Sequence, residues 1–154
     1  MEGNYLGIHI RSVENDNDDL ITLVYALTGE MHKRYGIIQK ESKRDRVLPD
    51  ITYAVVAYRD GEPVASGALM ERSDTVEIKH IYVSGAYRRM GIAVQVVAAL
   101  EQWARDKGCV SAILETGDKQ PEAIGLYRKM GYTVIPNFEP YVGMDDSICM
   151  KKIL

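Results

Sequence analysis

The chain has 154 residues, of which 46% are apolar and 27% are charged, and its formal net charge at pH 7 is −3. This length is enough for one hydrophobic core, so we expect a single domain over residues 1–154. Domains that bind nucleic acid normally carry a basic excess, so the negative charge argues against such a partner. No run approaches the ~18 consecutive apolar residues of a membrane span, which argues against a membrane protein.

The cysteines and the first residues bear on the cellular compartment. Cys109 and Cys149 lie in apolar, strand-like runs and form neither a disulfide framework nor a metal-ligand spacing. The first ten residues, MEGNYLGIHI, lack the basic and then apolar segments of a secretory signal. These features predict reduced core cysteines, no metal site and a cytoplasmic protein.

The first third of the chain predicts a strand, a helix and a charged segment. Residues 5–10 alternate loosely between polar and apolar, which favours a strand. Behind an acidic segment at residues 14–19, apolar residues recur at helical spacing until Gly36 closes the pattern. The mixed-charge run at residues 40–46 has no apolar face and indicates a solvated loop or a short helix.

Three strands are expected next. Apolar and β-branched runs at residues 52–58 and 64–70 flank Asp60-Gly61, which predicts a hairpin because such a turn requires positive φ. A short polar link leads to a third run at residues 76–83. Consecutive strands with short links indicate an antiparallel meander.

The third strand runs into a turn that has the features of a phosphate site. After residues 84–86, a helical apolar pattern begins behind Gly91, so unpaired amide groups and the positive end of a helix dipole meet at one point. Arg88 and Arg89 can add charge-assisted hydrogen bonds, and Gly91 lets the backbone approach a ligand. The alternative is an ordinary loop with two solvated arginines.

The second half of the chain completes a βαβ unit. The apolar run at residues 109–114 has the length of a buried strand, and the helix before it places it parallel to the strand at residues 76–83. Pro121 suits the first position of a further helix that ends at Gly131. Two more strands are expected at residues 132–135 and 147–153.

Together these elements predict an α/β (mixed α+β) fold. We expect a central mixed sheet of about seven strands, made of an antiparallel meander and a parallel βαβ unit. Helices should cover both faces of this sheet.

Two segments resemble motifs of a known enzyme family. The turn Arg88-x-x-Gly91-x-Ala93 is similar to motif A of the GNAT family of N-acetyltransferases, in which Arg or Gln, two residues, Gly, one residue, and Gly or Ala follow a strand. The helix after Gln120, with Leu126-Tyr127 and a closing Gly131, looks like motif B. The two motifs are in the family's order, and the resemblance covers the chain from the first helix onward.

The resemblance implies acetyl-CoA as the cofactor. Its pyrophosphate would lie on the backbone of the motif A turn, and its pantetheine arm would bond to the preceding strand like an added strand. One amide of that strand would face the thioester carbonyl. The implied cofactor-binding residues are Ile81, Tyr82, Val83, Arg88, Arg89, Met90, Gly91, Ile92, Ala93, Gln120 and Tyr127. Gln120 and Met90 depart from the residues most frequent in the family.

The implied reaction is direct attack by a primary amine of a small molecule in a ternary complex. An alkyl amine has a pKa near ~10, so a base must accept its proton. Glu77 aligns with the glutamate that is the general base in the histone-acetylating branch; Glu115, His80 and water are the alternatives. Tyr127 matches the motif B tyrosine that protonates or hydrogen-bonds the departing sulfur.

Several alternatives stay open on the sequence alone. Glu77 is equally consistent with a strand-face carboxylate in a salt bridge. For Tyr127 the alternative to the catalytic role, which the resemblance favours, is a core aromatic. The other functions in view are an acyl-CoA-binding regulatory module without turnover and an acetyltransferase for protein lysines or N-termini. Residues 31–43 and 138–143 are expected to line the acceptor pocket. Dimers are common in the family, so a homodimer is one expected assembly.

Overall fold

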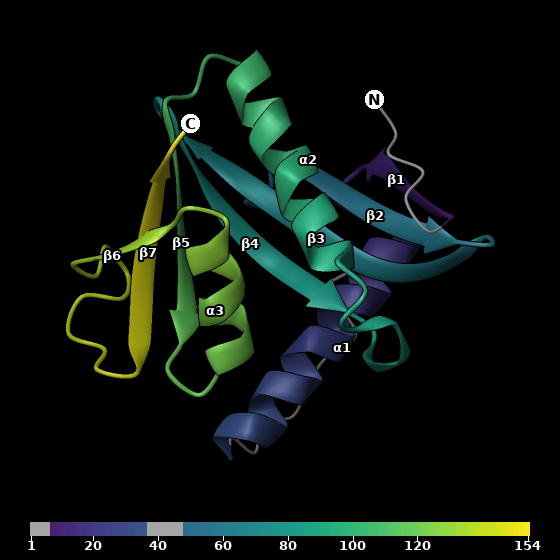
Figure 1. Ribbon diagram of the computed structural model, residues 1–154, viewed down its shortest axis with the longest axis horizontal. Coiled ribbons are helices and arrows are strands. Elements are labelled where there is room, and N and C mark those ends of the chain that lie inside the picture. The colour runs from purple at the N-terminus through teal and green to yellow at the C-terminus, as the bar shows by residue number, and fades with distance from the viewer. Residues whose placement is uncertain (1–6, 37–47) are drawn as a thin grey trace.

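The computed structural model describes residues 7–36 and 48–154. These ranges form a seven-stranded sheet with three α-helices packed on it (Figure 1). The strands are β1 (Ile8–Val13), β2 (Tyr53–Arg59), β3 (Glu62–Arg72), β4 (Thr75–Val83), β5 (Ser111–Gly117), β6 (Thr133–Ile135) and β7 (Ser147–Ile153). The helices are α1 (Asp18–Tyr35), α2 (Ile92–Asp106) and α3 (Pro121–Lys129), with a short 3₁₀ turn, η1 (Gly85–Tyr87), before α2.

The sheet has the strand order β1-β2-β3-β4-β5-β7-β6. Strands β1 to β4 are antiparallel neighbours, whereas β4 and β5 are parallel and are joined through α2. Strand β7 lies between β5 and β6 and is antiparallel to both. The predicted mixed fold, with a meander and one parallel βαβ unit, is therefore confirmed.

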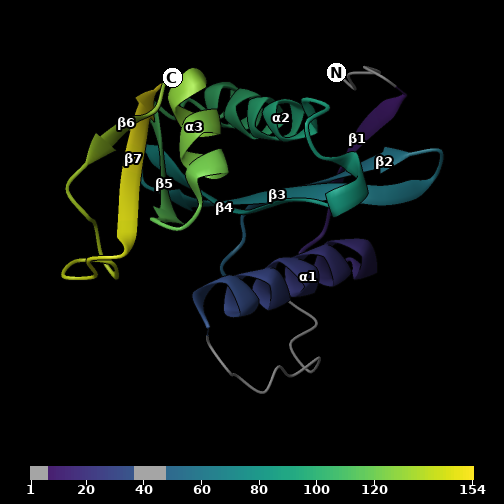
Figure 2. The ribbon, with the colours of Figure 1, turned by 60° about the horizontal axis from the view of Figure 1, so that its bottom comes forward.

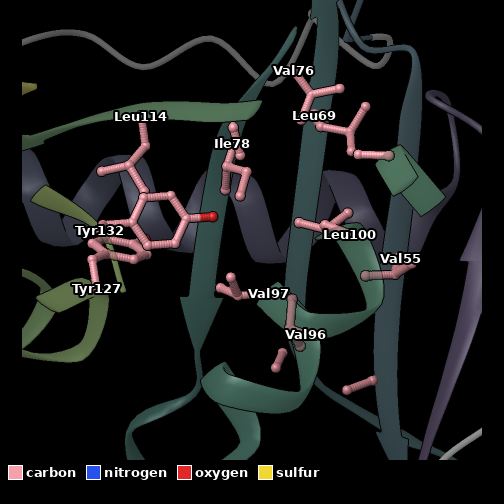
Figure 3. Close-up of a cluster of buried hydrophobic side chains, with 14 of the residues drawn as sticks. Val55, Leu69, Val76, Ile78, Val96, Val97, Leu100, Leu114, Tyr127 and Tyr132 are labelled. Carbon is pink, nitrogen blue, oxygen red and sulfur yellow. The ribbon is translucent and has the colours of Figure 1, made fainter. Parts of the chain in front are cut away.

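Helices cover both faces of the sheet, as predicted. Figure 2 shows α1 on one face and α2 and α3 on the other. The larger core cluster lies under α2, where Val96, Val97 and Leu100 recur at helical spacing and are fully buried (Figure 3). A smaller cluster lies under α1 and includes Leu20 and Leu23. Burial of each such side chain contributes roughly 1.5–3 kcal/mol, so these two faces fix how the helices sit on the sheet.

Some sequence-based boundaries differ from the structure. The first strand begins at Ile8 and continues to Val13, past the predicted end at residue 10. Cys109 precedes β5, which starts at Ser111, but both cysteines are buried and free. The charged run at residues 40–46 lies outside the described residues.

Two further properties concern the described residues alone. None of their helices has both the length and the apolar composition to cross a membrane. Within the same ranges, no group of three or more His, Cys, Asp or Glu residues is arranged to hold a metal ion.

Candidate active site

A cleft of about 1040 Å³ opens where β4 and β5 diverge. The parallel pairing of these strands runs from Thr75↔Ser111 to Ile78↔Leu114 and ends there, although both strands continue. Beyond Ile78, no described strand pairs with the edge of β4 that faces β5. The backbone groups of that edge are therefore available to an extended ligand, as at any open sheet edge.

A bulge in β4 accounts for this divergence. Two residues, His80 and Ile81, lie opposite the single β3 residue Gly67. His80 has φ 59, in the left-handed region, and Ser66 Oγ donates a 3.1 Å hydrogen bond to its carbonyl. A bulge bends its strand and increases the local twist, so β4 turns away from β5 at this point.

The turn between β4 and α2 presents free hydrogen-bond donors to the cleft. The amide groups of residues 89–94 donate no hydrogen bond to any other described residue. Gly91, with φ 77, is the N-cap of the 15-residue helix α2. Together with the positive end of the helix dipole, these amides fit a pyrophosphate group.

Arg88 uses its side chain to hold this turn in place. Its Nε donates a 2.8 Å hydrogen bond to the carbonyl of Val83, and its Nη2 lies 2.6 Å from Oε2 of Glu30 on α1. The guanidinium also lies over the ring of Tyr82, at 5.6 Å. The hydrogen bond that Arg88 donates to Glu30 raises the pKa of Arg88 above its ordinary value. A phosphate contact through this side chain, which the sequence predicts, would have to compete with Glu30.

Helix α1 also contacts the segment that leads into α3. Arg34 forms ion pairs with Glu30 and Glu122 and donates a 3.2 Å hydrogen bond to the carbonyl of Lys119. The Tyr35 hydroxyl accepts a 3.0 Å hydrogen bond from the Lys119 amide. Arg34 belongs to residues 31–43, which the sequence predicts at the acceptor pocket. Glu30 and Glu122 resemble ordinary charged residues on exposed helix faces and are not predicted as site residues.

Tyr127 lines the cleft and belongs to the buried core. Only 6% of the residue is exposed, and no described residue forms a hydrogen bond with the hydroxyl. Burial raises the pKa of this phenol above its ordinary value. At neutral pH the side chain is therefore a protonated donor with no partner in the described part of the chain.

Two carboxylates reach the cleft from the opposite face of the sheet. Ile78 and Leu114, paired neighbours on β4 and β5, point into the core under α2. Because side chains alternate along a strand, the adjacent Glu77 and Glu115 point toward α1. Both line the cleft. The phosphate turn and Tyr127 thus lie on one side of the gap and the carboxylates on the other.

The two carboxylates have different surroundings. Glu77 is 2% exposed, and its Oε1 lies 2.8 Å from Nη2 of Arg72. Glu115 is half-buried and accepts a 2.7 Å hydrogen bond from Ser147 Oγ. Burial raises the pKa of Glu115, against the opposing effect of the Ser147 hydrogen bond. Among the described residues, no Lys, Arg or His forms an ion pair with Glu115.

His80 is poorly suited to accept a proton from an amine. Burial, together with the nearby charge of Lys79, lowers the pKa of His80 to about 4. An imidazolium with this pKa loses its proton readily at neutral pH, so the side chain is neutral and weakly basic there.

The cleft brings together nearly all of the residues that the sequence predicts for cofactor binding. Those that line it are Ile81, Tyr82, Val83, Arg88, Arg89, Gly91, Ile92, Ala93, Gln120 and Tyr127. Met90 does not line it; its Sδ lies 3.9 Å from Nη1 of Arg59.

The two segments expected at the acceptor pocket contribute in part. Met31, Arg34 and Tyr141 line the cleft, and the Tyr141 ring packs edge-on against Phe138. A second hollow of about 470 Å³ shares Met31 and Glu115 with the cleft and is also lined by Tyr35. Residues 37–43 of the first segment lie outside the described residues.

Comparison with known proteins decides the family. A family model described as "Acetyltransferase (GNAT) family" matches residues 20–132, which is most of the chain. The chain belongs to the GNAT family. The resemblance drawn from the two motifs is therefore confirmed.

Relatives and solved structures agree with this membership. An IAA acetyltransferase of Azospirillum brasilense is 34% identical over 108 residues, which cover 69% of this chain and 70% of that protein. Human N-acetyltransferase 8 is 39% identical over 70 residues, 46% of this chain, and this GNAT chain spans only 30% of the human protein. A Klebsiella pneumoniae structure, solved as a proposed acyl-CoA N-acyltransferase, has a TM-score of 0.82 and 28% identity over 96% of this chain and 97% of its own.

Several of the neighbouring structures were solved with CoA or acetyl-CoA. The PaiA N-acetyltransferase of Thermoplasma acidophilum, in complex with coenzyme A, has a TM-score of 0.73 at 19% identity, over 96% of this GNAT chain and 99% of its own. At this identity the likeness establishes a shared fold.

Proposed function

We propose that this GNAT protein is an acetyl-CoA-dependent N-acetyltransferase that acetylates a primary amine of a small molecule by direct attack in a ternary complex. One observation carries the proposal. A single cleft joins a turn of free amides, an open strand edge and the unpartnered hydroxyl of Tyr127. A protein that only bound the cofactor would need the first two features but would not need the third.

The residues present fit acetyl-CoA, which when bound supplies an acyl group activated as a thioester. The amides of residues 89–94 would bind the pyrophosphate, because a helix N-terminus binds anions through its unpaired donors. The open edge of β4 beyond Ile78 would hold the pantetheine arm by backbone hydrogen bonds. An amide in the bulged segment would stabilise negative charge on the carbonyl oxygen; loss of one such donor typically costs ~10²–10³ in rate.

A carboxylate on the α1 side would accept the proton of the amine. Glu115 is favoured over Glu77, the residue that the sequence predicts, because its pKa is raised by burial and it has no cationic partner among the described residues. A carboxylate with a raised pKa is a stronger base, which brings proton transfer from the amine closer to balance. Glu77 instead forms an ion pair with Arg72 and lines the cleft.

Tyr127 would donate its proton or a hydrogen bond to the departing sulfur. Tyr127 belongs to the core on the α2 side of the sheet, whereas the carboxylates point toward α1, so donor and acceptor would act from opposite sides of the reacting centre. Burial keeps the phenol protonated, as a donor to a thiolate requires.

The experiment that tests this proposal measures thiol release from acetyl-CoA across a panel of small amines, amino acids, polyamines and peptides. We expect at least one small primary amine to release thiol well above the rate without acceptor. Calorimetry with CoA runs in parallel. Tight CoA binding with no release from any acceptor would overturn the enzyme assignment in favour of a binding module. Thiol release with peptides alone would indicate that the acceptor is a protein and not a small molecule.

A further inference from the structure

A buried carboxylate that does not line the cleft accepts a hydrogen bond from Tyr132, the aromatic neighbour of Tyr127. Glu101, on α2, is 3% exposed, and its oxygens accept a 2.7 Å hydrogen bond from the Tyr132 hydroxyl. Lys152 Nζ, from β7, donates to both oxygens at 3.0 and 3.1 Å. Arg105 Nη2 lies farther away, at 3.9 Å. The cluster therefore ties α2, the start of β6 and β7 to one another.

Stability alone does not explain such a cluster. A buried ion pair pays a large desolvation cost, and well-packed apolar residues of the same volume are often at least as stabilising. What a fully paired buried cluster provides is a defined geometry for its members. Here the aromatic member of the cluster is Tyr132, which is 2% exposed.

Tyr132 is held at several points and in turn supports Tyr127. Besides the hydrogen bond to Glu101, its ring lies 5.7 Å from Lys152 Nζ. Its ring centroid lies 5.7 Å from that of Tyr127, at an interplanar angle of 67° (Figure 3). Its amide also donates a 2.9 Å hydrogen bond to the carbonyl of Tyr127. Edge-to-face contacts of this kind are directional, so they set the orientation of both rings.

The position of the Tyr127 hydroxyl depends on this packing. No described residue forms a hydrogen bond with that hydroxyl, so the ring contacts determine where it points. A misplacement of about 1 Å in a reacting group can cost up to ~10² in rate.

We propose that Glu101 and Tyr132 are positioning residues for Tyr127: the Glu101 carboxylate fixes the Tyr132 ring, which holds the Tyr127 hydroxyl at the cleft. Glu101 lies on the helix whose N-terminus forms the phosphate turn, so the same contacts set Tyr127 relative to the bound cofactor. This inference rests on the proposed role of Tyr127 in acetyl transfer.

A double-mutant cycle on kcat tests the inference, with acetyl-CoA and the best amine of the panel. Tyr132→Phe keeps the ring and removes the hydroxyl; we expect kcat to fall roughly tenfold, within the range for a small misplacement, with KM for acetyl-CoA within twofold. In a Tyr127→Phe background the same change should have almost no effect on kcat. Glu101→Gln keeps the shape of the side chain but removes its charge. This variant should change kcat as Tyr132→Phe does in each of the two backgrounds.

The outcomes separate the possibilities. An equal fall in both backgrounds would mean a general structural role and would overturn the inference, as would an unchanged kcat in Tyr132→Phe. Full turnover in Tyr127→Phe would instead overturn the role of Tyr127 itself. Gln102→Ala, on the exposed side of the same helix turn, is the matched control and should leave kcat unchanged. Thermal melting and CoA calorimetry on each variant exclude loss of fold as the cause.

Discussion

The carboxylate of Glu30 lies 2.6 Å from Nη2 of Arg88, and so helix α1 holds the phosphate turn from the opposite face of the sheet. The same guanidinium donates to the carbonyl of Val83. Arg88 is therefore a tether that keeps the amides of the turn in one arrangement. An arrangement fixed before binding costs less on binding, so this tether should contribute to CoA affinity.

Arg88→Ala should weaken CoA binding about tenfold, equivalent to about 1.4 kcal/mol, with kcat changed much less. The turn loses both the hydrogen bond to Val83 and the ion pair to Glu30. Calorimetric titration with CoA provides the measurement, and an unchanged Kd would contradict the prediction.

Glu30→Gln separates tethering from competition. If Glu30 tethers the turn, its loss weakens CoA binding, at most about fivefold, because an exposed ion pair contributes up to ~1 kcal/mol. If Glu30 instead competes with phosphate for Arg88, the variant binds CoA more tightly. We expect Glu30→Gln to bind CoA more weakly. Tighter binding would instead support the phosphate contact that the sequence predicts for Arg88.

Tyr127→Phe should lower kcat by about 10² while the Kd for CoA stays within threefold, because the donor acts only as the sulfur departs. Burial raises the pKa of Tyr127, so the phenol stays protonated across a neutral to moderately alkaline assay range. The ratio of wild-type to variant kcat should therefore be similar at pH 7 and pH 9. A kcat equal to wild type at both pH values would remove Tyr127 from the mechanism.

The sequence predicted well those features that depend on local pattern. Apolar periodicity gave α2 and the strands, and the glycine spacing located the turn at Gly91 because a left-handed N-cap before a helix suits glycine. The two motifs gave the family. The turn, the β4 edge and Tyr127 could be assigned to one site because each lies within or beside a motif.

The sequence does not predict features that depend on contacts between residues far apart in the chain. Glu30 and Arg34 face the site from α1, more than fifty residues before Arg88 and Glu122 along the chain, and a charged helix face carries no mark of its partner. The insertion of β7 between β5 and β6 is likewise a matter of tertiary packing. Tyr132 was read as the first residue of a strand, whereas it precedes β6 and its ring packs in the core.

Glu115→Gln should remove the acidic limb of the pH–rate profile. A base must be deprotonated to act, so activity is present above its pKa and lost below it. Because burial raises the pKa of Glu115, this limb lies at higher pH than for an ordinary glutamate. Profiles of kcat/KM for wild type and variant give the measurement. Glu77→Gln is the matched control, and loss of the limb in that variant alone would return the role to Glu77.

Glu115→Gln should increase the stability of the fold although it lowers activity. A carboxyl whose pKa is raised on folding contributes most at low pH and loses that contribution as pH rises through the folded-state pKa. At neutral pH the ionised Glu115 is therefore a cost, and Glu115→Gln should raise Tm while it lowers activity. A lower Tm at neutral pH would show that the charge is stabilising and would argue against a residue kept for function.

Two glycine substitutions should change stability with opposite signs, and the contrast tests the bulge that opens the cleft. A Cβ on Gly67 would overlap Cγ1 of Val96, in the main core, and would lie 2.8 Å from Cδ1 of Ile81, which packs against that core. Overpacking of this kind costs about 1–3 kcal/mol, and each kcal/mol lowers Tm by roughly 2–4 °C in a chain of this size. Gly67→Ala should therefore lower Tm.

Gly125 is the control for stability alone, because it lines the cleft. It lies in α3, and a Cβ there would meet no atom within 4 Å. Gly125→Ala should stabilise the helix by roughly 0.5–1 kcal/mol, because alanine loses less backbone freedom on folding. Since Gly67 packs on Ile81 of the bulge, Gly67→Ala should also weaken CoA binding by displacing the open edge of β4. A Gly67→Ala protein with lowered Tm and wild-type CoA affinity would show that this edge does not hold the cofactor.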